Sequence, residues 1–235
     1  MKLSVIMAAY NEKDTILPAL ERVWAADIGP WEKEIIVVDN CSTDGTREIL
    51  QGLEQNDSLR IIFQPRNMGK GTSIRTAIPY CTGDYSIIQD ADLEYDPAEW
   101  PLLLDKALAE ELDAVYGSRT LSGQATYVYA QNYWGVRLLT WFTNLLFSTH
   151  YTDVATACKM VRTPVLQSLN LNCSGFDLDF ELSNKLGKNG YRIGEVPITY
   201  SPRSVAEGKK IRPKDGLHAL RVILRDRISS EGESS

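Results

Sequence analysis

Three acidic side chains, Asp90, Asp92 and Glu94, occur within five residues directly after an apolar run, Tyr85–Ile88. Carboxylates repel one another, so a group of three is stable only with positive charge between them. Hard oxygen ligands on alternate residues suit Mg²⁺ or Mn²⁺, which takes one or two carboxylates and fills its shell with phosphates and water. The alternative interpretation is an acidic turn leading into a helix, with Asp96-Pro97 as its cap and first turn.

The first half of the chain alternates between strand and helix patterns. Apolar strands are predicted at Leu3–Ala9, Glu34–Asp39, Arg60–Phe63, Tyr85–Ile88 and Ala114–Tyr116. Helices are predicted at Thr15–Ala26, from the Ser42–Gly45 turn to about Leu53, from Gly69–Gly71 to about Tyr80, and from Asp96 to Leu112. This alternation predicts an α/β fold, with a mainly parallel sheet and helices on both faces.

Polar clusters follow four of these strands, at Tyr10–Glu12, Asp39-Asn40, Asn67–Lys70 and Asp90–Glu94. Ligands of parallel sheets bind outside the carboxyl ends of the strands. We therefore expect one ligand site, built at that edge of the sheet from all four clusters.

The second half is less regular, with an amphipathic segment at Phe176–Lys188, an extended segment at Gly194–Tyr200, a last helix at Pro213–Arg227 and a tail at 229–235 that is expected to be disordered. The segment Trp134–Phe147 is apolar around most of a helix. At 14 residues it is too short to span a bilayer. It is either a buried helix or one that lies in a membrane interface, and the sequence leaves both open.

The composition excludes several classes of protein. At 235 residues the chain can bury a full core, and its net charge of −6 argues against general binding of nucleic acid. The basic charge lies at one end, where residues 203–227 hold eight Lys/Arg against three Asp/Glu. The four cysteines lack zinc-site or disulfide-framework spacing, and no GxSxG, HExxH, Walker A or GxGxxG motif occurs.

The segments Ala8–Glu12, Ile35–Thr46, Asn67–Gly71 and Asp90–Asp92 resemble, in order and spacing, the family 2 glycosyltransferases with the GT-A fold. The second half resembles the branch that includes dolichol- and polyprenyl-phosphate mannosyltransferases. The matching segments are Thr152-Asp153, Gly175–Asp177, Gly190–Ile193, Glu195–Ile198, Tyr200–Ile211 and Lys214–Gly216. The resemblance implies a single Rossmann-like GT-A domain over residues 1–228, with a nucleotide-sugar-binding half at 1–120 and an acceptor-side extension at 121–228.

The resemblance also implies roles for individual residues. The nucleoside pocket would be lined by Ala8, Tyr10, Glu12 and Asp39, and the metal that bridges the donor diphosphate would be held by Asp90, Asp92 and Glu94. The catalytic set would be Asp92, Arg119, Arg203 and Lys209, with the last two closing from a mobile loop over the donor diphosphate and acceptor phosphate. Further substrate contacts are expected at Lys70, Ala91, Arg137, Asp177, Asp179 and Lys210.

The implied reaction is a metal-dependent, inverting transfer of a hexose to a polyprenyl or dolichyl phosphate. By resemblance, GDP-mannose is the first choice of donor and UDP-glucose the second. Two departures from the family pattern leave the nucleotide base and the sugar open: Asn40-Cys41 where Asp-Gly is frequent, and Glu94 where Gln is frequent. A phosphate monoester is largely dianionic at neutral pH and needs positioning rather than a general base. A sugar hydroxyl would need a base, for which Asp177 or Asp179 are the candidates.

A lipid acceptor predicts a cytoplasmic protein that docks peripherally on the cytoplasmic face of a membrane. The expected docking surface is formed by Trp134, Trp141, Phe142 and Phe147 with Arg137, aided by the basic C-terminal segment. A membrane-protein partner is a further expectation. The remaining alternatives are a transferase for sugar hydroxyls, a nucleotidyltransferase and an inactive sugar-nucleotide-binding protein.

Overall fold

The structure is a computed structural model that describes residues 1–235 except 54, 56, 122–129, 204–212 and 230–235. At the helical residues 130, 131, 213 and 214 it describes the backbone alone. The predicted tail and the lysines at 209 and 210 therefore lie outside the described residues, apart from Ser229.

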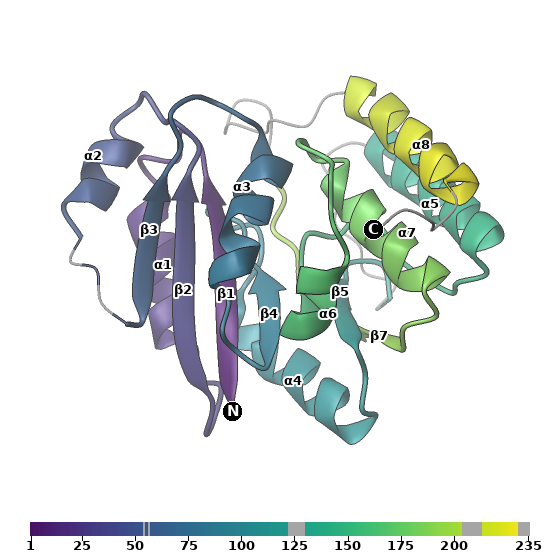
Figure 1. Ribbon diagram of the computed structural model, residues 1–235, viewed down its shortest axis with the longest axis horizontal. Helices are drawn as coiled ribbons and strands as arrows, with labels where there is room; N and C mark the ends of the chain where they lie inside the picture. Colours follow the sequence, from purple (N-terminus) through teal and green to yellow (C-terminus); the bar gives the residue numbers. More distant parts are fainter. Residues whose placement is uncertain (54, 56, 122–129, 204–212, 230–235) are drawn as a thin grey trace, which may run out of the picture.

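A seven-stranded sheet forms the centre of the molecule, in the order β3-β2-β1-β4-β6-β5-β7 (Figure 1). Its strands are β1 Lys2–Ala9, β2 Glu32–Asp39, β3 Leu59–Phe63, β4 Tyr85–Ile88, β5 Ala114–Ser118, β6 Lys159–Arg162 and β7 Ile193–Pro197. Neighbouring strands pair in parallel except around β6, which is antiparallel to β4 and β5. The predicted mainly parallel sheet is confirmed.

The described helices are α1 Ile16–Ala25, α2 Thr46–Gln51, α3 Lys70–Ala77, α4 Trp100–Ala109, α5 Ala130–Phe147, α6 Thr163–Ser168, α7 Leu178–Lys188 and α8 Pro213–Ile228. Short 3₁₀ turns follow α3 at Ile78–Tyr80 and precede α4 at Pro97–Glu99. The apolar side chains of α1 and α4 pack on one face of the sheet, and those of α3, α6 and α7 pack on the other. Alternate residues of β1 and β2 enter the two cores, as expected of strands buried on both faces.

The sequence analysis missed β6, and the reason is physical. The strand has only two apolar residues, between a lysine and an arginine, and runs directly into α6, so it lacks the apolar run on which recognition of strands depends. It pairs Tyr85 with Arg162 and Tyr116 with Lys159, and so separates β4 from β5. The predicted helix from Asp96 to Leu112 is also shorter than expected, because its first turn is 3₁₀ and α4 ends at Ala109.

Helix α5 has one face in the core and one face exposed. Its inner face belongs to the core, where Phe147 is 8% exposed and Phe142 packs against the buried residues. The outer face presents an apolar stripe, made of Trp134 (68% exposed), Leu138 (63%), Trp141 (59%) and Leu145 (61%). The expected docking surface was therefore wrong for Phe142 and Phe147, which stabilise the fold.

Helices α5 and α8 lie side by side over α7, at the end of the molecule away from α2 (Figure 1). Helix α8 adds exposed Leu217, Leu224 and Ile228 to this outer layer. Among the residues described, no helix combines the length and the apolar character that crossing a bilayer requires.

Candidate active site

The predicted polar clusters meet at one edge of the sheet, because β1 to β4 are parallel and end there. Arg203, from the segment after β7, enters this edge with its side chain 17% exposed. Its guanidinium lies 3.1 Å from Glu12 Oε2, 2.8 Å from Asp92 Oδ2 and 3.4 Å from Glu94 Oε1. The carboxylates that the sequence places together are thus joined by an arginine from the far end of the chain.

Glu94 holds the segment that carries this arginine. Tyr200 Oη donates a hydrogen bond to Glu94 Oε2 at 2.6 Å, and the backbone N–H of Arg203 donates to Oε1 at 3.0 Å. The Tyr200 ring also packs on Tyr95, with 5.2 Å between the ring centres. Both carboxylate oxygens of Glu94 therefore anchor the segment after β7, and the expected metal contact of Glu94 stays a prediction.

A second cation, Lys70, neutralises Asp90. Lys70 is the first residue of α3, and its Nζ lies 2.6 Å from Asp90 Oδ1 and 5.7 Å from the centre of the Phe176 ring. Burial alone would lower the pKa of Lys70, but the carboxylates of Asp90 and Asp179 raise it. The lysine is therefore charged and directed at the cluster.

Asp92 occupies surroundings that oppose its ionisation. Burial first, and then the carboxylates of Asp90 and Glu94, raise the pKa of Asp92 to about 7, while Arg203 acts in the opposite direction. A divalent cation would relieve this excess of negative charge. Within the described part of the chain, no three His, Cys, Asp or Glu side chains are arranged to hold a metal by themselves. Asp90 and Asp92 fit an ion that completes its coordination with phosphate oxygens, as Mg²⁺ and Mn²⁺ do.

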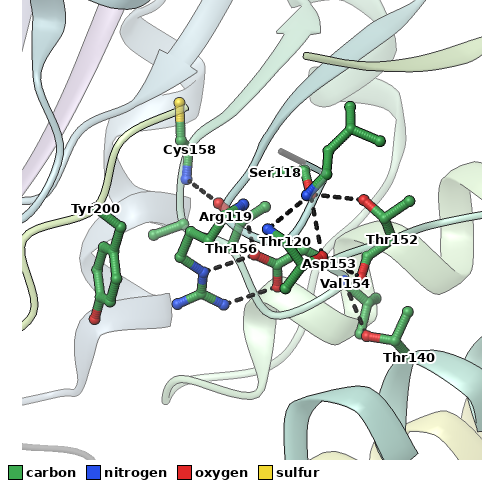
Figure 2. A network of polar contacts seen from close by, with 12 residues as sticks. Ser118, Arg119, Thr120, Thr140, Thr152, Asp153, Val154, Thr156, Cys158 and Tyr200 are labelled. Atoms are coloured by element: carbon green, nitrogen blue, oxygen red, sulfur yellow. Dashed lines mark hydrogen bonds and ion pairs between the residues drawn. The ribbon is translucent and has the colours of Figure 1, made fainter. Parts of the chain in front are cut away.

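Arg119 follows β5 and is fixed by a buried carboxylate, as Figure 2 shows. Asp153, which has no exposed surface, accepts hydrogen bonds from the Arg119 Nε at 2.6 Å, its Nη2 at 2.8 Å and its backbone N–H at 3.1 Å. Burial alone would raise the pKa of Asp153, but Arg119 lowers it. The guanidinium carbon lies 5.0 Å from the centre of the Tyr200 ring, so Arg119 borders the same segment as Arg203.

The residues expected to line a nucleoside pocket have unequal exposure. Ala8 and Tyr10 are half-buried at the end of β1, while Ala91 is 2% exposed and belongs to the core. The side chain of Asp39 has no exposed surface, because its Oδ1 accepts from the Ser42 N–H at 3.1 Å and its Oδ2 lies 2.6 Å from Arg47 Nε. Asp39 therefore caps the turn after β2, and its expected contact with a nucleoside stays a prediction.

The two candidate bases, Asp177 and Asp179, lie at the start of α7. Asp177 Oδ1 accepts a hydrogen bond from the Gly175 N–H at 3.0 Å, and Asp179 is 6% exposed with its Oδ1 3.7 Å from Lys159 Nζ. Gly71 lets this region approach α3, since a Cβ there would lie 2.6 Å from the carbonyl oxygen of Cys173. The start of α7 therefore borders Lys70 and the group formed by Glu12, Asp90, Asp92 and Glu94, which we call the carboxylate edge.

One expected site residue, Arg137, lies apart from this arrangement in the described structure. Arg137 is exposed on α5, and no ion pair joins it to the carboxylate edge in the part of the chain that is described. Lys209 and Lys210 lie outside the described residues, so their expected roles remain predictions.

The model of one protein family, described as glycosyl transferase family 2, matches residues 4–169. The chain belongs to this family. The match confirms the resemblance drawn from the motifs, and it covers the whole carboxylate edge except the segment that carries Tyr200 and Arg203.

Curated relatives of this family 2 chain share a quarter to a third of its residues. The low-salt glycan biosynthesis hexosyltransferase Agl6 of Haloferax volcanii is 30% identical over 94% of the chain and 53% of its own length. The dolichol-phosphate mannosyltransferase of Pyrococcus furiosus is 28% identical over 96% of the chain and 63% of its own length. The chain therefore spans between half and two thirds of the length of these two relatives.

Solved structures of glycosyltransferases share the fold. One is the glucosyl-3-phosphoglycerate synthase of Mycobacterium tuberculosis in complex with Mn²⁺, UDP and phosphoglyceric acid. The match covers 98% of the present chain and 80% of the synthase chain, with a TM-score of 0.70 and 19% sequence identity. Another is S. aureus TarS, residues 1–349, in complex with UDP. This match covers 99% of the present chain and 67% of the TarS chain, with a TM-score of 0.62 and 19% sequence identity. The predicted GT-A fold is confirmed.

The family 2 motifs did not reveal every residue that builds the site. Tyr200, Asp153 and Lys159 were given no role, although each contacts a predicted site residue. One signal was present in the sequence, because Lys159 lies between apolar neighbours in Ala157–Val161, where a lysine is buried only with a partner.

Proposed function

We propose that the chain catalyses the metal-dependent, inverting transfer of a hexose, with mannose favoured, from a nucleotide-sugar to a polyprenyl or dolichyl phosphate. The observation that carries this proposal is the position of Arg203 among Glu12, Asp92 and Glu94. It joins a cation of the acceptor-side half to the carboxylates expected to face the donor. The relative from Pyrococcus furiosus, a dolichol-phosphate mannosyltransferase, supports this class of acceptor.

Asp90 and Asp92 are the residues that would hold Mg²⁺ or Mn²⁺. The Mn²⁺ and UDP bound by the glucosyl-3-phosphoglycerate synthase support a divalent ion and a nucleotide donor here. When bound, the ion would neutralise charge on the donor diphosphate. Lys70 and Arg203 now contact Asp90 and Asp92. Once these carboxylates bind the ion, the two cations would supply further positive charge to the phosphates of the donor.

The proposed reaction is a direct displacement at the anomeric carbon. An oxygen of the acceptor phosphate forms the new bond to that carbon, the bond to the nucleoside diphosphate breaks, and its electron pair leaves on the diphosphate oxygen. No proton changes place, so the protein has only to bring two anions together. Arg119, fixed by Asp153, and Arg203 offset their repulsion.

The surroundings of the two candidate bases support a phosphate rather than a hydroxyl acceptor. Asp177 accepts a hydrogen bond from the Gly175 N–H, and Asp179 is buried beside Lys159. A general base has to reach the proton that it removes and release it to solvent. A buried, ion-paired Asp179 is poorly suited to that task.

The test is a donor panel, in which purified protein with Mg²⁺ or Mn²⁺ is given GDP-mannose, UDP-glucose or other labelled donors. Each donor is incubated with and without a polyprenyl phosphate in detergent, and label is followed into organic solvent. We expect lipid-linked sugar from one donor, with GDP-mannose first, and its loss when EDTA is added.

Two results would contradict the proposal. Transfer to glycan hydroxyls but not to lipid phosphate would assign the hydroxyl-transferase alternative. Metal-dependent binding of a donor without any transfer would identify an inactive sugar-nucleotide-binding protein.

We further propose that the protein docks peripherally on the cytoplasmic face of a membrane through the outer face of α5 and α8. This α5–α8 face consists of Trp134, Leu138, Trp141, Leu145, Leu217, Leu224 and Ile228. Arginines at 225 and 227 in the last turns of α8 flank its apolar residues. Exposed tryptophans and leucines bordered by arginine suit the boundary between headgroups and acyl chains. A membrane-protein partner that covers the same face remains a second proposal.

Replacing Trp134 and Trp141 together by serine is expected to reduce binding to vesicles at least tenfold, because both side chains are more than half exposed on this face. Flotation with vesicles that contain anionic lipid measures the loss, and thermal unfolding verifies the fold. Trp24→Ser is the matched control, since Trp24 is exposed on α1, at 43%. Equal binding by both variants would remove the α5–α8 face as the docking surface.

A further inference from the structure

Lys159 is a lysine in the interior of the protein, with no exposed surface. It begins β6, and its Nζ donates hydrogen bonds to the carbonyl oxygens of Val154 at 2.9 Å and Thr156 at 2.5 Å. The Nζ also lies 5.1 Å from the centre of the Tyr116 ring and 3.7 Å from Asp179 Oδ1. Burying a charge costs several kcal/mol unless it is paired, so this lysine needs an explanation beyond packing.

Asp179, the partner of Lys159, is equally confined. Its Oδ1 is buried and accepts no hydrogen bond within the described part of the chain, so the ion pair at 3.7 Å is the contact that compensates it. Asp179 also acts on Lys70, whose pKa it raises together with Asp90. One carboxylate therefore forms an ion pair with Lys159 in the interior and acts electrostatically on Lys70 in the candidate active site.

The other side of Lys159 leads to Arg119. The charge of Lys159 acts on Asp153, which accepts hydrogen bonds from the Nε, the Nη2 and the backbone N–H of Arg119. Lys159 binds the carbonyl groups of Val154 and Thr156, which belong to the same loop as Asp153 (Figure 2). Charges thus alternate in sign from Asp90 through Lys70, Asp179, Lys159 and Asp153 to Arg119.

We propose that Lys159 is a positioning residue, which holds Lys70 through Asp179 and Arg119 through Asp153 at the geometry that binds the donor diphosphate and the incoming acceptor. The inference rests on the proposed function for the roles of Lys70 and Arg119. Burial lowers the pKa of Lys159, while Asp179 and Asp153 act against that shift. The network also explains why Asp179 serves as a fixed charge and not as a base.

The test separates positioning from stability with three variants. Lys159→Met keeps the unbranched side chain, one atom shorter, and removes its charge, and Lys159→Met/Asp179→Leu removes both charges of the buried pair. Breaking a buried pair destabilises a protein, whereas replacing both members by apolar groups restores stability in many cases. Lys33→Met is the matched control, because Lys33 also binds main-chain carbonyl groups, at Val23, Trp24 and Ala26, but at the opposite edge of the sheet.

The measurements are the thermal midpoint, the affinity for nucleoside diphosphate with Mn²⁺, and kcat and KM for the donor. For Lys159→Met we expect a donor affinity at least tenfold weaker and a further loss in kcat. For the double variant we expect a recovered midpoint without recovered affinity or kcat. Lys33→Met is expected to bind the donor as the unaltered protein does.

Two outcomes would overturn the proposal. One is donor affinity and kcat that follow the thermal midpoint through all variants, which is the behaviour of a purely structural pair. The other is a folded Lys159→Met variant that binds nucleoside diphosphate within about twofold of the unaltered protein. Nucleotide affinity is measured without any acceptor. The comparison of the Lys159 variants therefore stays interpretable even if the proposed transfer to a lipid phosphate is not observed.

Discussion

Replacing Asp92 with asparagine is expected to reduce sugar transfer by roughly a thousandfold, on the order of what loss of a major electrostatic contact costs an enzyme. Asp92 lies where Asp90, Glu94 and Arg203 converge, and the variant removes the charge proposed to hold the metal. Label transfer from the donor panel measures the loss. Titration of nucleotide binding with Mn²⁺ should show that its metal dependence has weakened.

The same variant is expected to be at least as stable as the unaltered protein when no metal or donor is present. The pKa of Asp92 in the folded protein is about 7, well above its ordinary value of 3.8. The folded state therefore favours the protonated form, and stability falls as pH rises from about 4 to 7. Above pH 7 the full cost of ionisation remains, and asparagine removes it.

Asp96→Asn is the matched control for Asp92→Asn. Asp96 lies four residues further along the same segment and caps the turn before α4 by accepting from the Ala98 N–H at 3.0 Å. Asparagine caps nearly as well as aspartate, so this variant loses one charge without losing its structural role. Equal activity of the Asp92→Asn and Asp96→Asn variants would contradict the assignment of Asp92.

The second large effect is expected from Arg203→Lys, which should lower transfer about a hundredfold although it preserves the charge. The guanidinium reaches three carboxylates at once through Nη1, Nη2 and Nε. A lysine has a single ammonium group and cannot match this fork. Steady-state kinetics with varied donor and varied acceptor should show the loss in kcat as well as in KM.

Arg192→Lys provides the comparison, since Arg192 is an exposed arginine whose Nη1 lies 4.0 Å from Glu111. Exposed ion pairs contribute little, so this variant should retain full activity. If Arg203→Lys were as active as Arg192→Lys, the fork of contacts around Arg203 would have no part in the reaction.

The sequence predicted the carboxyl edge of the sheet well, because strands buried on both faces and the polar residues after them leave local signals. Asp90 and Asp92 were chosen from such signals, whereas Arg203 came from the family resemblance, and the structure joins Arg203 to Asp92. Exposure could not be predicted in the same way. The side chain of Asp39 is covered by Arg47. Arg47 lies on helix α2, and the sequence pattern of that helix does not predict a contact with Asp39.

Long-range ion pairs account for most of what the sequence could not predict. The pairs Lys159–Asp179 and Arg119–Asp153 form because β6 runs antiparallel between β4 and β5, and the sequence of that strand lacks an apolar run. The two faces of α5 pose a related problem. Its apolar residues point both inward and outward, and only the packing of α7 and α8 determines which are covered.

The contacts of Arg203 also set the order in which the site can form during synthesis. The arginine meets Glu94 across 109 residues and Glu12 across 191 residues of chain. Closing such long loops has an entropic cost that earlier contacts have to offset, so this pairing is expected late in folding. At about 5–20 residues per second, a ribosome would expose the acidic cluster for several seconds or more before Arg203 emerges. The contacts of Arg203 with Glu12, Asp92 and Glu94 can therefore form only after the whole sheet has been synthesised.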